Sequence, residues 1–361
     1  MLLSISIDLS KNIKVLFIWK IDARLKKHLI NSTKNFLNVN LIFPKDFSEK
    51  NLLKISDDAD IIIGWRPSAE LLKSAKKLKL YINPGTGIKH HIKNFREINK
   101  SRSKDNKINL INGHGHAYAT AQHTVAMLLA LMNNIILHHN LMAAGKWRTS
   151  DDKDLSDVTI QLRNRKIGLL GYGAINKYVH KFLAGFENEF HILKRNWNKT
   201  DTANEEINFA KNKIYKYKEN DLNKFLKSID ILIIAIPHTD KTENLIDSKE
   251  LKLLSKNSLI VNIARGIIIN EKSLYEALKN KKIAGAALDV WYNYNPKKDK
   301  AGKEFPYSHP FHKLNNVLLS PHRAASPFDD LKRWDEVIEN ISRLAKGKND
   351  FLNIVDLKEE Y

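Results

Sequence analysis

Short runs of apolar residues alternate with longer amphipathic stretches along the first 115 residues. The apolar runs have the length and β-branched content of buried strands, and they predict strands at 13–19, 39–43, 61–65, 79–83 and 108–111. Between these runs, helical spacing of apolar residues predicts helices at 23–36, 48–56 and 67–77. Because strands alternate with helices, we expect a parallel sheet covered on both faces.

A second alternating series begins at residue 166. It predicts strands at 166–170, 189–193, 229–236, 258–263, 283–288 and 316–320. It also predicts helices at 176–184, 221–226, 248–254, 271–279 and 328–345, the last ending near Gly347 as a glycine cap would favour. The pattern is that of an α/β protein with two doubly wound parallel sheets.

One long helix is predicted between the two series, at 120–144. Its middle is apolar on nearly every side, which is typical of a helix that is buried on several faces. We therefore expect this helix to be covered by its own domain and by a second subunit.

The chain has 361 residues, enough for two domains, and no cysteine. Disulfide bonds, a thiolate nucleophile and cysteine-ligated metals are excluded for this reason. Residues 1–12 lack a basic segment followed by a sustained apolar run, so we expect no secretory signal and a cytoplasmic protein. The longest apolar stretch, 124–137, is interrupted by two asparagines and is too short to cross a bilayer, so no membrane association is expected.

The formal net charge is +20, from 60 Lys and Arg against 40 Asp and Glu. Such a charge allows nucleic-acid binding through phosphate neutralisation. However, the basic residues are scattered, and the two densest groups are explained as an exposed edge strand at 211–218 and a solvated loop at 297–303. A solvated basic surface that attracts anionic substrates is the favoured interpretation, and nucleic-acid binding is the weaker alternative.

Gly171 and Gly173 follow a predicted buried strand and open a predicted helix, in the pattern Gly-x-Gly-x-x-Asn that ends at Asn176. The first glycine permits a tight turn, and the second lets the backbone approach a pyrophosphate at the helix N-terminus. Inside a βαβ unit this pattern indicates a dinucleotide site, whereas alone it is also compatible with an unliganded turn. We expect Asn176 to loosen the helix–strand packing without removing the phosphate contacts.

The end of the next strand bears on the choice of cofactor. NAD sites favour an acidic residue about 20 residues after the glycines, whereas an arginine accommodates the 2′-phosphate of NADP. Residues 193–196 read Leu-Lys-Arg-Asn, with no acid. Lys194 and Arg195 therefore predict that NADP is preferred over NAD, unless they are ordinary surface cations.

Six segments carry a resemblance when they are taken together. They are the Leu-Arg-Asn-Arg-Lys run at 162–166, Gly-Tyr-Gly-Ala-Ile-Asn at 171–176, Pro-His-Thr-Asp-Lys-Thr at 237–242, Val-Asn-Ile-Ala-Arg-Gly at 261–266, Gly-Ala-Ala-Leu-Asp-Val-Trp at 285–291 and Asn-Val-Leu-Leu-Ser-Pro-His at 316–322. In this order and spacing they resemble the D-isomer-specific 2-hydroxyacid dehydrogenase family. The resemblance extends from about residue 61 to residue 356.

The resemblance implies a flavodoxin-like substrate domain formed by residues 1–115 and 321–361, and a Rossmann dinucleotide-binding domain formed by residues 116–320. It also implies a homodimer that transfers a hydride between NADP(H) or NAD(H) and a small 2-keto acid or D-2-hydroxy acid. The alternative is a dinucleotide-sensing, corepressor-like interaction protein with little turnover. The presence of Arg265 and His322 favours the enzyme.

Within the family's motifs, Arg265 matches the substrate arginine and His322 the general acid/base. A guanidinium can hold a carboxylate and polarise a carbonyl, and an imidazole exchanges protons near neutral pH. Gly85, Thr86 and Gly87 match the loop that offers backbone N–H groups to the substrate carboxylate. The cofactor contacts implied by the resemblance are Thr120, Gly171, Gly173, Ala174, Ile175, Lys194, Arg195, Pro237, Thr242, Ile263, Ala264 and Asp289.

The glutamate that normally supports the catalytic histidine in this family is missing. Depending on the direction of counting, Tyr294 or Asn295 occupies its position, and neither is an acid. Asp299 or Glu304 from the following loop could fold back instead. We predict a neutral partner, and hence a lower histidine pKa and a pH optimum for reduction shifted towards acid.

Several histidines, His114 and His116 among them, have a spacing that could chelate zinc. No acidic residues cluster beside them in sequence, and hydride transfer needs no metal. We therefore expect no metal site and assign these histidines to substrate contact or packing.

Overall fold

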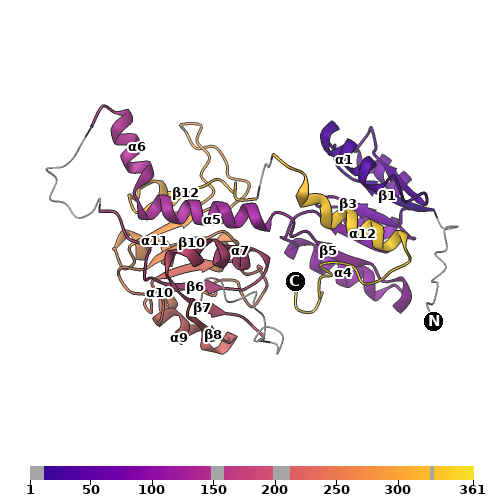
Figure 1. Cartoon of the computed structure of the whole chain (residues 1–361). Helices are drawn as coiled ribbons and strands as arrows, with labels where there is room; N and C mark the ends of the chain where they lie inside the picture. Colours follow the sequence, from indigo (N-terminus) through magenta and orange to yellow (C-terminus); the bar gives the residue numbers. More distant parts are fainter. Residues whose placement is uncertain (1–11, 148–157, 198–211, 326–328) are drawn as a thin grey trace. The chain divides into compact units, whose positions relative to one another are not determined.

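The computed structural model describes residues 12–147, 158–197, 212–325 and 329–361 (Figure 1). Its chain divides into two compact units, one formed by residues 1–116 and 328–361 and the other by residues 117–327. The prediction about a secretory signal concerns residues 1–12, of which 1–11 lie outside the described ranges, so the cytoplasmic location stays a prediction.

The first unit is built on a five-stranded parallel sheet with the order β2-β1-β3-β4-β5. Its strands are β1 Ile13–Phe17, β2 Val39–Ile42, β3 Ile61–Ile63, β4 Leu80–Asn83 and β5 Asn109–Asn112. Its helices are α1 Ala23–Thr33, α2 Glu49–Ser56, α3 Ala69–Ser74, α4 Lys89–Lys100 and α12 Asp335–Ala345. This strand order is that of flavodoxin-like sheets.

Apolar side chains fill both faces of this sheet. On one face, Val15 and Phe17 of β1 pack with residues of α1 and α12, such as Leu29 and Ile341. On the other face, Leu16 of β1 packs with residues of α3 and α4. Consecutive residues of β1 therefore serve opposite cores, which explains why the strand is uniformly apolar rather than alternating.

The second unit is built on a seven-stranded parallel sheet with the order β12-β11-β10-β9-β6-β7-β8. Its strands are β6 Lys166–Leu170, β7 Glu189–Leu193, β8 Ile214–Tyr217, β9 Ile231–Ile234, β10 Leu259–Asn262, β11 Gly285–Leu288 and β12 Val317–Leu319. Its helices are α5 Ala117–Met132, α6 Ile135–Ala143, α7 Ala174–Leu183, α9 Leu222–Lys227, α10 Ser248–Leu251 and α11 Glu271–Lys279. The chain runs outward in both directions from β6 and β9, which is the Rossmann arrangement.

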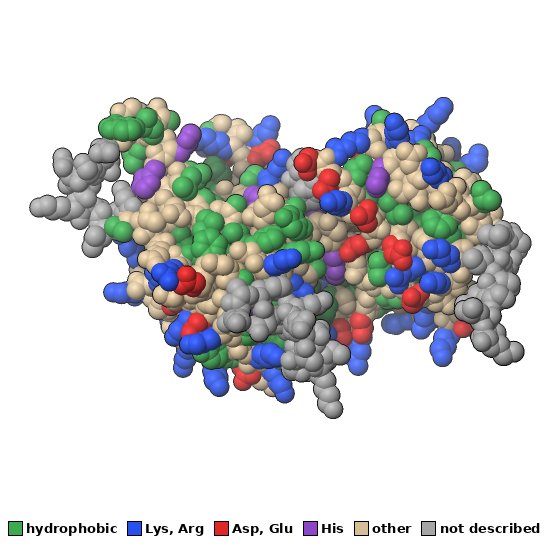
Figure 2. Space-filling model, viewed as in Figure 1, with side chains coloured by type: hydrophobic (Ala, Val, Ile, Leu, Met, Phe, Trp, Pro, Cys, Tyr) green, Lys and Arg blue, Asp and Glu red, His purple; other side chains and the backbone are tan. Residues whose placement is uncertain are grey.

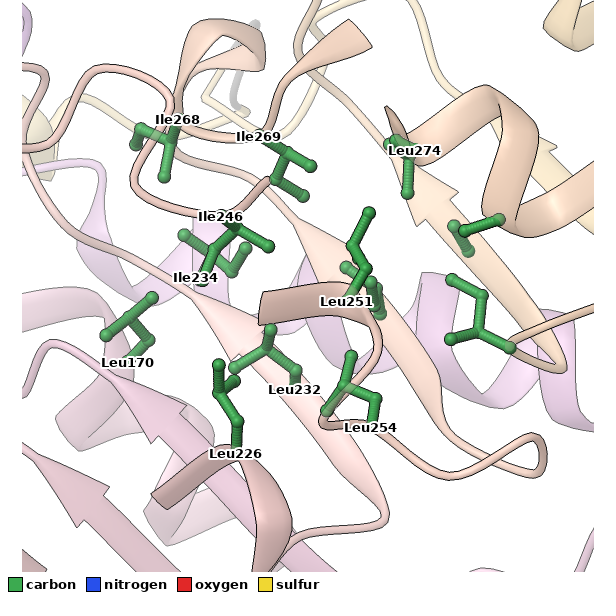
Figure 3. Packing of buried hydrophobic residues seen from close by; sticks show 14 of the residues in the cluster. Leu170, Leu226, Leu232, Ile234, Ile246, Leu251, Leu254, Ile268, Ile269 and Leu274 are labelled. Atoms are coloured by element: carbon green, nitrogen blue, oxygen red, sulfur yellow. The ribbon is translucent and has the colours of Figure 1, made fainter. Parts of the chain in front are cut away.

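Helices cover both faces of the second sheet as well. Figure 3 shows one face, where Leu232 and Ile234 of β9 meet side chains of the helices that follow, among them Leu251 and Leu274. On the opposite face, Ile231 and Ile233 pack with residues of α5 and α7. The prediction of an α/β protein with two doubly wound parallel sheets is confirmed.

The predicted long helix at 120–144 is wrong as a single element. The structure breaks it at Asn133 and Asn134 into α5 and α6, which are bent by 64°. Asn134 has φ of 49°, a left-handed conformation that asparagine tolerates better than most residues and that ends a helix. The predicted burial is found for α5, but no residue of α6 is buried.

Among the described residues no single helix is long and apolar enough to cross a membrane. Only α5 and α6 taken together reach that length and composition, and they are sharply bent.

Most other elements are found near their predicted places, with shorter ends. The predicted helix at 328–345 starts outside the described ranges; a 3₁₀ turn at Lys332–Trp334 precedes α12, which begins only at Asp335 and ends before Gly347, whose φ is 70°. The basic run at 211–218 contains β8, which is an edge strand as predicted, although residue 211 is not described. Residues 321–325, predicted within the first domain, group with the second unit.

Candidate functional site

The carboxyl ends of the strands of the seven-stranded sheet carry most of the predicted site residues of the second unit. Gly171 directly follows β6 and has φ of 84°, where glycine is the least strained residue. A Cβ at this position would lie 2.7 Å from the carbonyl oxygen of Ala235, which follows β9. Gly171 therefore permits the turn at the point where the strand order reverses, the usual ligand site of such sheets.

Gly173 caps the N-terminus of α7, and apart from its chain neighbours and the helix backbone no atom of the described residues lies within 4 Å of where its Cβ would be. Ala174 and Ile175 form the first turn of this helix, whose leading N–H groups have no partners within a helix. Asn176 is completely buried, and its side chain donates to the carbonyl of Gly171 at 2.7 Å. Asn176 thus ties the helix to the turn, in contrast to the loosening expected for it.

Lys194 and Arg195 follow β7 and are half-buried. The Nζ of Lys194 lies 5.5 Å from the ring centre of Trp197, and that of Lys216 lies 5.0 Å from the same ring. The Trp197 indole donates to the carbonyl of Tyr217 at 2.9 Å. A fixed aromatic ring with cations around it therefore stands beside the glycine turn, since the Gly171 N–H donates to the Leu193 carbonyl at 2.9 Å.

Pro237 and Thr242 lie in the turn that follows β9. The Thr242 hydroxyl donates to the carbonyl of Pro237 at 2.7 Å and accepts from the Thr239 N–H at 2.8 Å, so it closes this turn. Thr120, in the first turns of α5, is buried, and its hydroxyl oxygen has no hydrogen-bond partner among the described residues. Ile263 and Ala264, which follow β10, are buried.

Arg265 is held by the turn that follows β10. The buried side chain of Asn262 donates to the carbonyl of Arg265 at 3.0 Å and accepts from the Ala264 N–H at 3.1 Å. The Arg265 guanidinium donates to the carbonyl of Ala264 at 2.6 Å. Gly266 comes so close to Trp291 that a Cβ would lie 2.5 Å from its carbonyl oxygen, which places the arginine turn against the segment after β11.

Asp289, directly after β11, organises the loop that carries His322. One carboxylate oxygen accepts from the Ser320 hydroxyl and from the Arg323 N–H at 2.7 Å, and the other accepts from the Ala324 N–H at 3.0 Å. These bonds span the histidine, whose φ of 58° is uncommon for a residue other than glycine. The buried carboxylate therefore holds a strained loop conformation, and its predicted contact with the cofactor stays a prediction.

His322 meets a hydroxyl where a carboxylate is usual in the family it resembles. The Tyr294 hydroxyl lies 3.1 Å from Nδ1 of His322, with the two rings edge to face. Asn295, the other candidate partner, is exposed, and its backbone N–H donates to the side chain of Asn293. Asp299 accepts from two N–H groups of its own turn.

The surroundings of His322 favour the neutral form of its ring. Partial desolvation and the Arg265 guanidinium lower the pKa of His322, and the Asp289 carboxylate offsets them only in part. Partial desolvation raises the pKa of the Tyr294 hydroxyl, so the tyrosine keeps its proton. Because Arg265 shifts the pKa of both groups, the guanidinium, imidazole and phenol form one electrostatic cluster.

Three residues of this cluster were not predicted from the sequence. Ser320 bridges Asp289 and the ring of His123, whose Nε2 lies 3.1 Å from the hydroxyl. The Trp291 indole donates to the carbonyl of Ser320 at 2.9 Å. Trp291 and Ser320 lie within the motifs at 285–291 and 316–322, but only the fold shows which groups they contact. His123 of α5 lies in none of the six motifs.

Gly85, Thr86 and Gly87 belong to the first unit, in the loop between β4 and α4. The Thr86 hydroxyl donates to the carbonyl of Gly113 at 3.1 Å and lies 2.8 Å from Nε2 of His116. A Cβ on Gly113 would lie 2.5 Å from the carbonyl oxygen of Pro84, so the loops after β4 and β5 are in close contact. The loop at 85–87 is thereby held in one conformation just before the N-terminus of α4.

No group of three or more His, Asp and Glu side chains is placed to hold a metal ion in the described ranges. The backbone N–H of His114 donates to Glu336 at 2.7 Å, and His116 is engaged by Thr86. In the fold these two histidines therefore have packing and loop-holding contacts.

The residues of the second unit fit a dinucleotide. The open space at Gly173 leaves the backbone accessible at the N-terminus of a ten-residue helix, where a pyrophosphate is stabilised. The buried hydroxyl of Thr120 has a free hydrogen-bonding capacity within the described residues. Lys194 and Arg195 place positive charge after β7, where a 2′-phosphate is expected.

Comparisons with known proteins agree with this geometry. Residues 125–324, more than half of the chain, match the family model for the D-isomer specific 2-hydroxyacid dehydrogenase NAD binding domain. A D-3-phosphoglycerate dehydrogenase of Methanocaldococcus jannaschii is 27% identical over 87% of this chain and 55% of its own length. A glyoxylate reductase of Thermofilum pendens is 29% identical over 64% of this chain and 62% of its own length.

The chain thus matches less than two thirds of the length of these two curated relatives. Among solved structures, an acyclic imino acid reductase, Bsp5, in complex with NADPH and D-Arg is 25% identical, with a TM-score of 0.72. That likeness covers 95% of this chain and 100% of the reductase. From the family model and the fold together, this chain belongs to the D-isomer specific 2-hydroxyacid dehydrogenase family.

Proposed function

We propose that this protein is an oxidoreductase that interconverts a small 2-keto acid and its D-2-hydroxy acid with NADP(H). The observation that carries the proposal is the cluster of Arg265, His322 and Tyr294, held by Asp289 beside the carboxyl ends of β10 to β12. Family membership supports an enzyme over a corepressor-like sensor or a nucleic-acid binder.

The roles of the residues follow from their chemistry. Bound reduced nicotinamide would supply the hydride for the carbonyl carbon. The Arg265 guanidinium binds the substrate carboxylate and polarises the carbonyl, since it cannot lose its charge at working pH. Imidazolium at His322 gives its proton to the oxygen of the substrate during reduction, and the neutral imidazole accepts a proton during oxidation.

Backbone N–H groups of Gly85, Thr86 and Gly87 provide a further site for the carboxylate. This loop leads into α4, a helix of twelve residues whose N-terminus favours anions. The assignment rests on the match of these residues to the family's loop and on the rigid hold of Thr86 and Gly113.

The decisive experiment is a panel of 2-keto acids assayed with NADPH and NADH, with His322→Asn as the test variant. Asparagine tolerates the left-handed backbone of residue 322, so the loop can keep its shape. We expect NADPH-dependent turnover in the wild type and a loss of about 10²-fold or more in the variant. His312→Asn is the control, because His312 also lies 3.1 Å from a tyrosine hydroxyl but belongs to the turn at Phe311–Lys313.

Cofactor choice has its own test, Arg195→Asp. A carboxylate after β7 repels a 2′-phosphate and can accept from the ribose hydroxyls of NAD. We expect the ratio of kcat/KM for NADPH to that for NADH to fall by about tenfold or more, as loss of a charged hydrogen bond predicts. An equal ratio in wild type and variant would contradict the preference for NADP.

Reduction of 2-imino acids is a second candidate, favoured by the neutral Tyr294 partner of His322. An iminium carbon accepts a hydride and becomes an amine, so the C=N π pair moves to nitrogen and no proton is needed from the protein. A neutral imidazole can accept a hydrogen bond from the iminium N–H, whereas an imidazolium would repel it. The imino acid reductase with a similar fold supports this candidate.

The two candidates separate with pH. Keto-acid reduction needs imidazolium and so falls as pH rises through the lowered pKa of His322. Iminium reduction does not need this proton. We expect NADPH oxidation with pyruvate at pH 8.5 to increase when methylamine is added, with N-methylalanine formed. If no product depends on the amine, imino-acid reduction is contradicted.

We also propose that the protein is a homodimer and that α6 contributes to the interface. The side chains of Ile135, Ile136 and Met142 are 52%, 52% and 54% exposed, and Figure 2 shows hydrophobic side chains on this helix. Such a row of exposed apolar groups is costly in water and suits a two-fold contact with a second copy. Light scattering of Ile136→Glu against wild type tests this, with a monomer expected for the variant.

A further inference from the structure

The turn between β6 and α7 is tied to the helix by side-chain hydrogen bonds. The Asn176 amide donates to the carbonyl of Gly171 at 2.7 Å and to that of Leu170 at 3.4 Å. The Tyr172 hydroxyl lies 2.7 Å from Nδ1 of His180. Asn176 and His180 are four residues apart and so lie on the same face of α7. One face of the helix therefore holds the two consecutive residues that begin the turn.

Asn176 stands where dinucleotide-binding patterns usually have their third glycine. That glycine has no side chain and lets the helix pack closely on the strand. Asn176 is completely buried, so its side chain lies inside the unit rather than in solvent. The Gly171 carbonyl, which belongs to neither the strand nor the helix, thus receives a donor that glycine at position 176 could not supply.

The oxygen of the Asn176 amide indicates that this side chain does not bind the pyrophosphate itself. Oδ1 is buried and has no hydrogen-bond partner among the described residues. An oxygen in this state costs stability, so packing alone does not explain an asparagine here. A pyrophosphate offers only acceptor oxygens, and the amide nitrogen already donates to two carbonyls. The side chain can therefore act on a bound cofactor only through the turn that it holds.

We propose that Asn176 is a positioning residue that holds the glycine turn in its phosphate-binding conformation before the cofactor arrives. The backbone N–H groups at the start of α7 are then already in place for the pyrophosphate, and binding does not have to order them. Such a hold matters at this turn because glycine loses more conformational freedom on being fixed than any other residue. NAD and NADP share the pyrophosphate, so this role is independent of the keto acid and of the preference for NADP.

The test is Asn176→Gly, which completes the usual three-glycine pattern but removes the amide. We expect the Kd values for NADPH and for NADH to rise by the same factor, about tenfold, as for the loss of one hydrogen bond. The KM for each cofactor should rise likewise, with kcat and the KM for the keto acid unchanged. Calorimetric titration of the folded protein without keto acid measures both Kd values and needs no turnover.

Asn316→Ala is the matched control in the same unit. The Asn316 amide also donates to two carbonyls, those of Leu278 and Ala284, each at 3.2 Å. However, it directly precedes β12 and so lies at the opposite end of the parallel sheet from the glycine turn. We expect this variant to lose thermal stability without a change in either Kd. Because alanine favours helices, Asn176→Ala gives the same measurement if Asn176→Gly does not fold.

Unchanged or tighter binding of both cofactors by folded Asn176→Gly would overturn the inference, even if its thermal stability fell, because Asn176 would then be only structural. A loss of affinity for NADPH alone would overturn it too, since that result would place Asn176 at the 2′-phosphate. Failure of the proposed function is seen separately, as a wild-type protein that binds the cofactor but reduces no 2-keto acid.

Discussion

Two tyrosine–histidine pairs in the second unit join the same atoms in different surroundings. Tyr172 and His180 are buried, with the hydroxyl 2.7 Å from Nδ1, and His180 packs on Phe190 with ring centres 4.1 Å apart. Tyr294 and His322 lie at the surface, with the hydroxyl 3.1 Å from Nδ1. The atoms in contact are the same, so their environment must decide what each pair does.

Burial fixes the protonation state of the first pair. Desolvation lowers the pKa of His180 to about 4, so its ring is neutral at working pH and can only stabilise the glycine turn through Tyr172. The second pair lies in a strained loop beside Arg265 and Asp289, and its imidazole is exposed. An exposed imidazole can exchange its proton with water or substrate, which a fully buried one cannot do. The ability of His322 to exchange a proton therefore depends on the loop and the charges around it, since the same tyrosine–histidine pair is inert when it is buried.

The largest expected effect is on activity, from His322→Asn. Removal of the proton donor should lower kcat by about 10² to 10⁴-fold, the usual range for general acid–base catalysis. The unfolding free energy should change by less than about 1 kcal/mol, because residue 322 is exposed and asparagine accepts its backbone angle. Steady-state kinetics check the expected fall in kcat, and thermal unfolding of the same sample checks the expected change in stability. A large loss of stability would make this pair structural, like the buried one.

The next effect is on acid stability, from His180→Gln. In the unfolded chain the histidine has a pKa of about 6.5, against about 4 in the fold, so between these values the unfolded state binds more protons. Its contribution is complete above pH 6.5 and is lost as pH falls towards 4, a loss of about 3 kcal/mol. Glutamine accepts from Tyr172 but does not titrate. Denaturant unfolding at pH 7 and pH 4.5 should show a smaller acid loss in the variant, and parallel curves would contradict this account.

A smaller effect is expected from Tyr172→Phe. The change removes the buried hydrogen bond between the Tyr172 hydroxyl and Nδ1 of His180, which should destabilise the fold by about 2 kcal/mol. Tyr178→Phe is a matched control on α7, because Tyr178 is 38% exposed. Chemical denaturation of the two variants gives the comparison. Similar stabilities for both would show that the buried bond contributes little.

The smallest expected effect, in free energy, comes from Tyr294→Glu. A neighbouring carboxylate favours imidazolium and raises the pKa of His322, so keto-acid reduction should persist to higher pH. The expected gain is about fivefold in rate at a pH one unit above the wild-type pKa, for a shift of one unit. Asn295→Glu is the control, because residue 295 has no contact with the imidazole among those described. An unchanged pH profile in Tyr294→Glu would show that residue 294 does not influence the pKa of His322.

The sequence predicted most elements because they depend on local patterns. Continuous apolar runs such as 166–170 become strands buried on both faces where helices cover both sides of a sheet. The turn after this strand needs Gly171 because its backbone geometry disfavours other residues. The bend at Asn134 was missed because apolar residues continue on both sides of the two asparagines, and only the left-handed backbone of Asn134 ends the helix. The network of Asp289, Ser320 and His123 was missed because its members are up to 197 residues apart along the chain.

By itself the sequence determined the α/β class, the glycine turn for a dinucleotide and the presence of a guanidinium and an imidazole, because motifs and periodicity are local properties of the chain. Only the tertiary structure decided that Tyr294 rather than Asn295 faces His322 and that Asp289 holds the strained histidine loop. These contacts depend on which strand ends become neighbours in a sheet, and strand order is set by packing of the whole domain rather than by any local pattern.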